Sequence, residues 1–167
     1  MARYICQIWR NLMISFGNTA SSRLFDNETF DRTFQRDLHS CRSTLLIESP
    51  FIRLNRVMDL LPVFERLQRK GVKVVVNTRP PEEHDEEYEH QASEAISLLQ
   101  SMDAEVLFTI KHHRKIAIID RELFWDGSLN ILSYYDSCEI MRRTVSALEA
   151  ESLIKFIGLN KYLMKVS

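Results

Sequence analysis

The sequence predicts an α/β protein in which a mixed β-sheet carries helices on both faces. Up to residue 102, short apolar runs alternate with amphipathic segments of helical length, the order expected of strands linked by crossover helices. Three short strand candidates then follow one another, and the last two are close enough to form a hairpin. With 167 residues, 45% of them hydrophobic, the chain is long enough to bury a core in one domain.

The N-terminal residues are expected to form a helical segment, 1–24, that precedes the main domain at 25–167. Within it, residues 4–16 carry apolar side chains at helical spacing. This pattern favours a helix that docks on the core or on a partner chain over a helix that lies on a membrane surface.

The main domain is expected to contain four amphipathic helices. One is capped by Asn27, and the others lie at about 54–70, 86–102 and 146–157. Gly71 is the expected C-cap of the second of these four, and Pro62 should kink that helix or mark a later start. Apolar runs predict five strands, at 43–51, 72–78, 104–110, 115–120 and 122–128.

The net charge of −1 hides an uneven distribution of charged residues. Residues 82–94 contain seven acidic side chains and no Lys or Arg. The rest of the chain holds 22 basic against 16 acidic residues, so a locally basic face that binds a polyanion is compatible with the composition.

Cysteine usage and hydropathy indicate a cytoplasmic protein. The three cysteines are an odd and widely spaced set that forms neither a disulfide framework nor a zinc pattern: Cys6, Cys41 and Cys138. No apolar run is long enough to span a membrane, so we expect no stable membrane insertion. Arg10 interrupts the apolar start of the chain and no cleavage site follows, which argues against a signal peptide.

One pattern of polar residues predicts chemistry. It reads His113-x-Lys115, four residues, Asp120, then six residues and Gly127-Ser128-x-Asn130. Because side chains alternate along a strand, a strand at 115–120 would put His113 and Lys115 on the same face. An imidazole that attacks or transfers a proton, beside a lysine and amide donors that neutralise phosphoryl oxygens, is suited to phosphoryl transfer without a metal ion. The neighbouring His112 should point to the opposite face, as a solvated or groove-lining residue.

The pattern resembles the signature of the phospholipase D superfamily, H-x-K-x4-D-x6-G-S-x-N, and matches it without a gap. Upstream, LIESPFI and GVKVVVNTRP are similar to the first half of that family. The resemblance covers about residues 25–145 and is strongest to the small, single-motif nuclease branch. The run GSLNILSYYDSCEIMRR is also similar to nuclease-like domains attached to bacterial helicases.

The resemblance implies a role for each matched residue. His113 would attack the phosphorus and form a phosphohistidine, while Lys115 and Asn130 would hold the non-bridging oxygens. Ser128 would assist them, and Glu139 stands where the family often has an acid that orients the nucleophilic histidine. Asp120 would be a structural carboxylate rather than a base.

The resemblance also implies an assembly. No metal ion or other cofactor is required. The chemistry uses two histidines, whereas this chain has one motif, so two chains would share one site in a symmetric homodimer.

Four more basic residues are candidate contacts to substrate phosphates: Lys111, Arg114, Arg142 and Arg143. Lys111 and Arg114 could equally be solvent-exposed residues at the start of the strand, and Arg142 and Arg143 could pair with acids across the dimer. We interpret Trp125 as core or turn packing rather than as a base-stacking residue, and His84 and His90 as part of a solvated acidic segment rather than metal ligands.

These observations predict a metal-independent phosphodiesterase, specifically a nuclease that cleaves DNA or RNA. A phospholipid hydrolase or transphosphatidylase is an alternative that only the apolar N-terminal segment supports. A nucleic-acid-binding subunit of a helicase or defence complex is another, because the chain is short and close to neutral.

Overall fold

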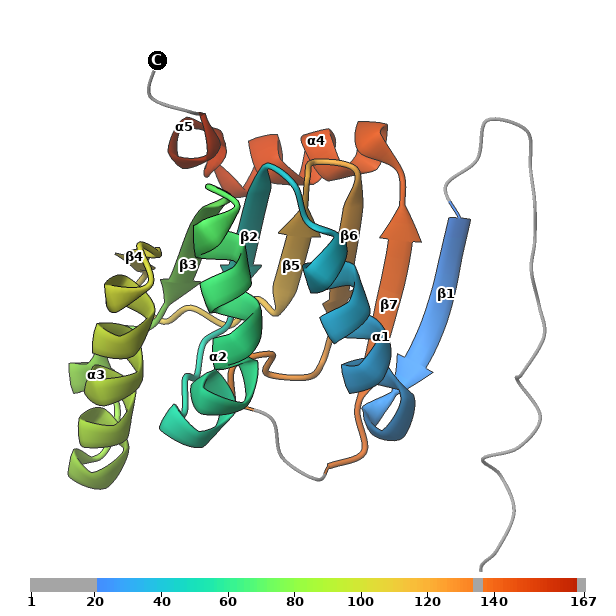
Figure 1. The fold of residues 1–167 in the computed structure, drawn as a ribbon. Coiled ribbons are helices and arrows are strands. Elements are labelled where there is room, and N and C mark those ends of the chain that lie inside the picture. The colour runs from blue at the N-terminus through green and yellow to red at the C-terminus, as the bar shows by residue number, and fades with distance from the viewer. Residues whose placement is uncertain (1–20, 134–136, 165–167) are drawn as a thin grey trace, which may run out of the picture.

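The computed structural model describes residues 21–133 and 137–164, which form a single seven-stranded sheet with helices packed against it (Figure 1). The strands are β1 (Ser21–Asp26), β2 (Thr44–Glu48), β3 (Lys73–Thr78), β4 (Glu105–Phe108), β5 (Ile116–Ile119), β6 (Leu123–Gly127) and β7 (Ile140–Val145). The helices are α1 (Asn27–Ser40), α2 (Leu54–Arg69), the 3-10 turn η1 (Pro81–Glu83), α3 (Glu86–Ser101), α4 (Ala147–Ile157) and α5 (Asn160–Leu163).

The strands lie in the order β1-β7-β6-β5-β2-β3-β4. β2, β3 and β4 are parallel to one another, as the crossover helices α2 and α3 require. β5 pairs antiparallel with β2, and β6, β7 and β1 continue the antiparallel half. The predicted mixed sheet is therefore confirmed, including the hairpin of β5 and β6.

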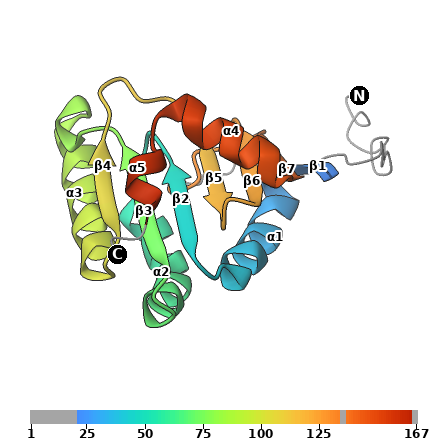
Figure 2. The same ribbon diagram turned by 90° about the horizontal axis from the view of Figure 1, so that it is seen from above.

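Helices cover both faces of the sheet, as the sequence predicts. Leu45 and Ile47 face a core shared with α1, α2 and α3. Leu46, between them, faces a second core built with α4 and α5. Figure 2 shows α4 and α5 on the side of the sheet opposite α1 and α2. Strand alternation thus gives the central strands two buried faces.

One helix boundary differs from the prediction, and the later start of α2 that Pro62 could have marked is not observed. The N-cap of α1 is Asp26, not Asn27, because the carboxylate of Asp26 accepts the Thr29 amide at 2.9 Å and forms a capping box. α2 starts before Pro62 and runs through it. It ends as predicted before Gly71, whose φ of +66° glycine adopts without strain.

Four elements were missed: the edge strand β1, its neighbour β7, the 3-10 turn η1 and the short α5. Residues 21–24, assigned to the N-terminal helical segment, instead begin β1. The helix expected at 4–16 and Cys6 lie outside the described residues. Across 21–133 and 137–164, no helix is both long enough and apolar enough to cross a bilayer.

Candidate active site

His113 and Lys115 lie at the end of the sheet where β2 and β3 finish and β5 begins. His113 and Lys115 lie in the stretch just before β5, which starts at Ile116, one residue later than expected. Ile116 is paired with Asp126 near the end of β6, so the GSLN segment that follows lies beside them. Residues that are distant in the sequence therefore meet at one end of the central strands.

His113 and Lys115 are in contact, as the predicted common face requires. Nζ of Lys115 lies 3.0 Å from Nδ1 of the exposed imidazole and donates to the His113 carbonyl oxygen at 2.8 Å. The lysine itself is buried. Its burial lowers the pKa of Lys115; the charge of Glu139 opposes this shift, and the charge of Arg79 adds to it. The result is a desolvated cation beside the imidazole, which suits recognition of an anion.

Ser128 links the GSLN segment to Glu139. Its hydroxyl donates to the Glu139 carboxylate and accepts the Ile140 amide at 3.1 Å. Glu139 also accepts from the Ser137 hydroxyl at 3.0 Å. Within the described part of this single chain, the carboxylate is thus bonded to serines and acts on Lys115 by charge, rather than hydrogen-bonding His113 as the resemblance implies.

Gly127 allows β6 and β7 to approach closely before the GSLN segment turns away. A Cβ at this position would lie 2.1 Å from the carbonyl oxygen of Ile140 and 2.7 Å from the sulfur of Met141. No side chain fits there without displacing backbone. The requirement for glycine is therefore steric, since its φ is not in the left-handed region.

Asn130 carries an unsatisfied group. Its side-chain oxygen is buried and has no hydrogen-bond partner among residues 21–133 and 137–164. Buried amide oxygens normally have a donor. A ligand or a second chain could supply one here.

A buried acid, Glu48, fixes the segment around the catalytic histidine. The carboxylate accepts from Arg114 at 2.6 and 2.7 Å and from the Asn77 amide at 2.9 Å, and Nε2 of His112 lies 3.5 Å away. Burial alone would favour the protonated acid, yet the interactions with His112, Arg114 and Asn77 together hold the pKa of Glu48 at about 2. His112 and Arg114 flank His113, and both contact Glu48. Glu48 therefore anchors the backbone of His113 from both sides.

This cluster corrects two expectations. His112 is buried against Glu48, rather than solvated or lining a groove. Arg114 forms a two-pronged ion pair with the same acid instead of standing free for phosphate. Sequence reasoning missed Glu48, although a lone acid in the apolar run LLIESPF must find partners when the strand is buried.

The other predicted phosphate contacts are mostly engaged within the chain. Arg142 pairs with Asp126 at 2.7 Å, and Arg143 pairs with Asp37 at 2.6 Å, so both find acids in their own chain rather than across a dimer. The backbone amide of Lys111 donates to the Glu83 carboxylate at 3.0 Å. The side-chain ammonium of Lys111 has no partner in the described part of the chain.

Trp125 is fully buried and its indole donates to Asp37 at 2.9 Å, which confirms the packing interpretation. It contacts Phe30 edge-on, with ring centroids 5.2 Å apart. The indole is therefore not accessible to a base.

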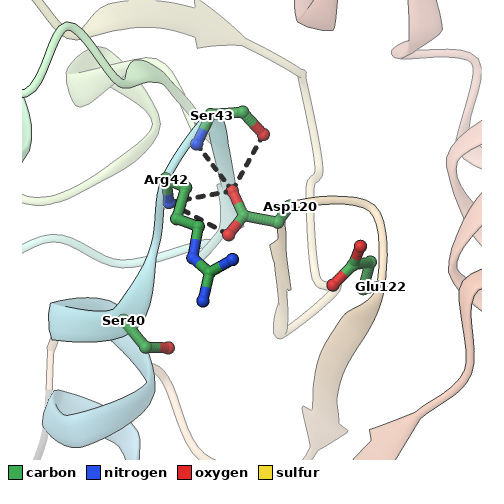
Figure 3. Close-up of a pocket in the computed structure, with 5 residues that line it drawn as sticks. All are labelled: Ser40, Arg42, Ser43, Asp120 and Glu122. Atoms are coloured by element: carbon green, nitrogen blue, oxygen red, sulfur yellow. Dashed lines mark hydrogen bonds between the residues drawn. The ribbon is translucent and has the colours of Figure 1, made fainter.

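Asp120 lies at the opposite end of β5 from Lys115 and takes no part in the cluster around His113. Figure 3 shows its carboxylate turned toward the backbone of Arg42 and Ser43, in a shallow polar pocket that Ser40 and Glu122 also line. It accepts the amides of Arg42, Ser43 and Thr44 at 3.0, 2.7 and 3.2 Å and the Ser43 hydroxyl at 2.9 Å.

Burial opposes ionisation of Asp120, yet the hydrogen bonds from Ser43, Thr44 and Arg42 lower its pKa. The motif aspartate thus ties the β5–β6 turn to the start of β2. This geometry matches the structural role that the resemblance implies.

Among residues 21–133 and 137–164, no three His, Cys, Asp or Glu side chains are arranged to hold a metal ion. His84 packs against Phe51 and Tyr88, and His90 lies 3.5 Å from Glu94.

Comparisons with known proteins address the family and the fold. Residues 34–150 match the family described as "Cardiolipin synthase, PLD-like domain". A comparison with the sequences of curated proteins found no match. Solved structures with the same fold include NucT from Helicobacter pylori, with a TM-score of 0.67 and 16% identity over 83% of this chain and 93% of that one.

Two further structures are similar. Nuc from Salmonella typhimurium, a phospholipase D family member, has a TM-score of 0.67 and 13% identity over 83% of this chain and 91% of its own. The archaeal chromatin protein TrmBL2 has a TM-score of 0.55 and 16% identity over 84% of this chain and 51% of its own. The ungapped motif and the match over most of the domain give one conclusion: this chain belongs to the PLD-like domain family, in the phospholipase D superfamily.

Proposed function

We propose that this protein is a metal-independent phosphodiesterase that cleaves DNA or RNA, with His113 as its nucleophile. One observation carries the proposal. The ammonium of buried Lys115 lies 3.0 Å from the imidazole of exposed His113, beside the GSLN segment. A nucleophile and a desolvated cation at this distance can contact the same phosphate group.

The reaction would proceed in two displacements. An imidazole nitrogen of His113 attacks the phosphorus, a P–N bond forms, and the P–O bond to the leaving strand breaks as a second histidine protonates that oxygen. Water then attacks the same phosphorus, gives its proton to the second histidine and releases His113. Lys115 and Asn130 would neutralise the non-bridging oxygens in both steps, with Ser128 and Glu139 holding the segment in place.

The second histidine would be His113 of another copy of the chain. Two observations support a homodimer. The sequence holds a single copy of the motif, and the buried oxygen of Asn130 lacks a donor among residues 21–133 and 137–164. A shared site across a two-fold axis would supply both a proton donor for the leaving group and new neighbours for Asn130.

Nucleic acid is the favoured substrate for two reasons. The chain resembles the single-motif nuclease branch, and it shares its fold with TrmBL2, a chromatin protein with a described mode of DNA binding. Phospholipid as the substrate rests only on the helix expected at 4–16, which lies outside the described residues. A helicase or defence-system partner remains a prediction from the GSLNILSYYDSCEIMRR resemblance.

The test is hydrolysis of single- and double-stranded DNA and RNA in excess EDTA, with phosphatidylglycerol vesicles as a parallel substrate. We expect wild type to cleave a nucleic acid in EDTA and His113→Ala to be inactive. His112→Asn is a matched control that removes the neighbouring imidazole; it should retain His113-dependent cleavage at a reduced level. Cleavage that requires Mg²⁺ or survives in His113→Ala contradicts the mechanism. Nucleic-acid binding without turnover by a dimeric wild type would instead support the binding-subunit alternative.

The shared site has its own test. Size-exclusion chromatography with light scattering should report a dimer. Wild type is then mixed with His113→Ala and the subunits are allowed to exchange. The remaining activity should be proportional to the fraction of dimers that are wild-type homodimers, because a mixed dimer lacks one of the two histidines. If activity falls only in proportion to the wild-type chains, each chain holds a complete site and the dimer proposal fails.

A further inference from the structure

A cluster of three aromatic rings and two arginines stands beside the site, and the proposed chemistry does not use it. The ring centroids of Phe51, His84 and Tyr88 lie 4.7 to 5.7 Å apart. Arg79 lies over the Phe51 ring at 5.3 Å, and Arg53 lies over the Tyr88 ring at 5.2 Å. All five side chains are partly exposed, and the rings belong to neither buried core of the described residues. We call these five residues the aromatic–arginine cluster.

The cluster belongs to the loops at the same sheet edge as His113. Phe51 follows β2, Arg79 follows β3, and Tyr88 lies in the first turn of α3. Loops at the carboxyl ends of parallel strands are the usual place for ligand sites in open α/β sheets. The rings therefore come from two segments, Phe51 after β2 and His84 with Tyr88 between η1 and the first turn of α3, which meet at this end of the sheet.

Hydrogen bonds through neighbouring residues connect the cluster to His113 and Asn130. Nε of Arg79 donates to the carbonyl oxygen of His112 at 2.7 Å, one residue before His113. On the other side, the Tyr88 hydroxyl lies 3.4 Å from that of Ser133, whose amide donates to the carbonyl oxygen of Asn130 at 3.0 Å. The cluster thus adjoins both halves of the site.

Like charges also meet at this border. The charge of Arg79 reaches Lys115 and lowers its pKa, although Glu83, 3.8 Å from Arg79, is positioned to offset part of that charge. Two cations held near each other favour a ligand with more than one negative charge, as successive phosphates provide. Rings next to such a pair match the composition of surfaces that bind unpaired nucleotides.

We propose that the aromatic–arginine cluster is a base-stacking subsite for the nucleotide next to the phosphate at His113, which makes single-stranded nucleic acid the substrate class. The inference rests on the proposed function and deepens it. Aromatic rings can stack on the face of any base, but only when that base is not already stacked and paired in a duplex. Arg79 would contact the phosphate that follows the stacked base.

The surroundings of the cluster also favour one strand over two. Exposed acids border it in η1 and at the start of α3: Glu82, Asp85, Glu86 and Glu87. A duplex carries one negative charge per roughly 1.7 Å of its axis, about twice that of a single strand. This acidic border would repel a second strand more than it disfavours a single strand held by the two arginines and Lys115.

The test compares two oligonucleotides with the same number of phosphates, an unpaired thymidine oligomer and a fully abasic one. Their affinities are measured by fluorescence anisotropy with the full chain carrying His113→Ala, so that no cleavage occurs. We expect the thymidine oligomer to bind roughly 5- to 160-fold more tightly, the range for one stacked base. Phe51→Leu and Tyr88→Leu should each reduce that ratio toward one, whereas Tyr88→Phe should preserve it.

Phe156→Leu is the matched control, because Phe156 is 87% exposed on α4, on the other face of the sheet. It should leave the ratio unchanged. Each variant is first checked for a wild-type circular dichroism spectrum. If either Phe51→Leu or Tyr88→Leu fails to fold, the other variant still tests the subsite. Equal affinity for the two oligomers, or a ratio unaffected by both leucine variants, overturns the subsite.

Other outcomes separate this proposal from the proposed function. If wild type cleaves nucleic acid in EDTA but shows no preference for bases, the subsite fails and the nuclease stands. If the protein binds neither oligomer, both fail. If Phe51→Leu and Tyr88→Leu abolish binding to phosphatidylglycerol vesicles while leaving the oligonucleotide ratio intact, the cluster is a lipid site and the proposal is wrong.

Discussion

Nζ of Lys115 donates to the backbone carbonyl of His113 and lies 3.0 Å from Nδ1 of the same residue. A buried cation is thus held against an exposed imidazole. The contact keeps the charge in place before any substrate arrives, which limits the reorganisation needed when charge develops on a phosphate.

The pH dependence of cleavage should report Lys115. Burial lowers its pKa below the ordinary value of 10.5, Glu139 opposes this shift and Arg79 adds to it. If the protonated lysine is required, kcat/KM falls as pH rises through the lowered pKa. Removing the charge of Arg79 in Arg79→Gln should move this alkaline limb to higher pH, and Glu139→Gln should move it lower. A pH–rate profile whose alkaline limb is the same in both variants would rule out Lys115 as its origin.

Glu48→Gln should destabilise the fold near neutral pH. The folded-state pKa of about 2 lies below the ordinary 4.5, so Glu48 contributes stability above pH 4.5 that is lost as pH falls toward 2. The loss should be about 3 kcal/mol at pH 7, similar to removing one partner of a buried ion pair. Urea unfolding at pH 7 and at pH 3 measures it. Exposed Glu122→Gln is the control, expected within about 0.5 kcal/mol of wild type. An equal loss at both pH values would contradict the assignment.

Asp120→Asn should affect stability rather than turnover. The carboxylate accepts three backbone amides far from His113, so the variant should lose roughly 2 kcal/mol, the contribution of hydrogen bonds to a charged group. Its kcat should stay within about twofold of wild type at a temperature where it is folded, whereas Lys115→Met should lose about 100-fold or more. Urea unfolding and steady-state kinetics separate the two effects. A large drop in kcat for folded Asp120→Asn would place Asp120 in the chemistry.

Much of the fold could be predicted because its signals are local. Leu45 to Ile47 form an apolar run bounded by turn residues, and the periodicity of Phe30, Phe34 and Leu38 marks one face of a helix. The strand IMRRTV was missed because Arg142 and Arg143 resemble a basic patch. Their partners lie 16 and 106 residues away, and no local pattern shows that these charges are paired.

The same difference between local and distant contacts explains what was missed at the site. The spacing of His113 and Lys115 is local, and it correctly predicted that their side chains meet. The burial of His112 and the ion pair of Arg114 both depend on Glu48, which lies 66 residues before Arg114 in the chain. The aromatic–arginine cluster was missed for the same reason, since Phe51 lies more than 30 residues before the segment that holds His84 and Tyr88.

The claim that His113 is the nucleophile has the most direct test of all. Wild type is mixed with a single-stranded oligonucleotide labelled with ³²P at an internal phosphate, quenched in alkali within milliseconds and separated by denaturing electrophoresis. We expect labelled protein whose label is stable in alkali and lost in acid, as a phosphohistidine requires, and no labelled protein with His113→Ala. Rapid cleavage without any labelled protein, or equal labelling of His113→Ala, would contradict it.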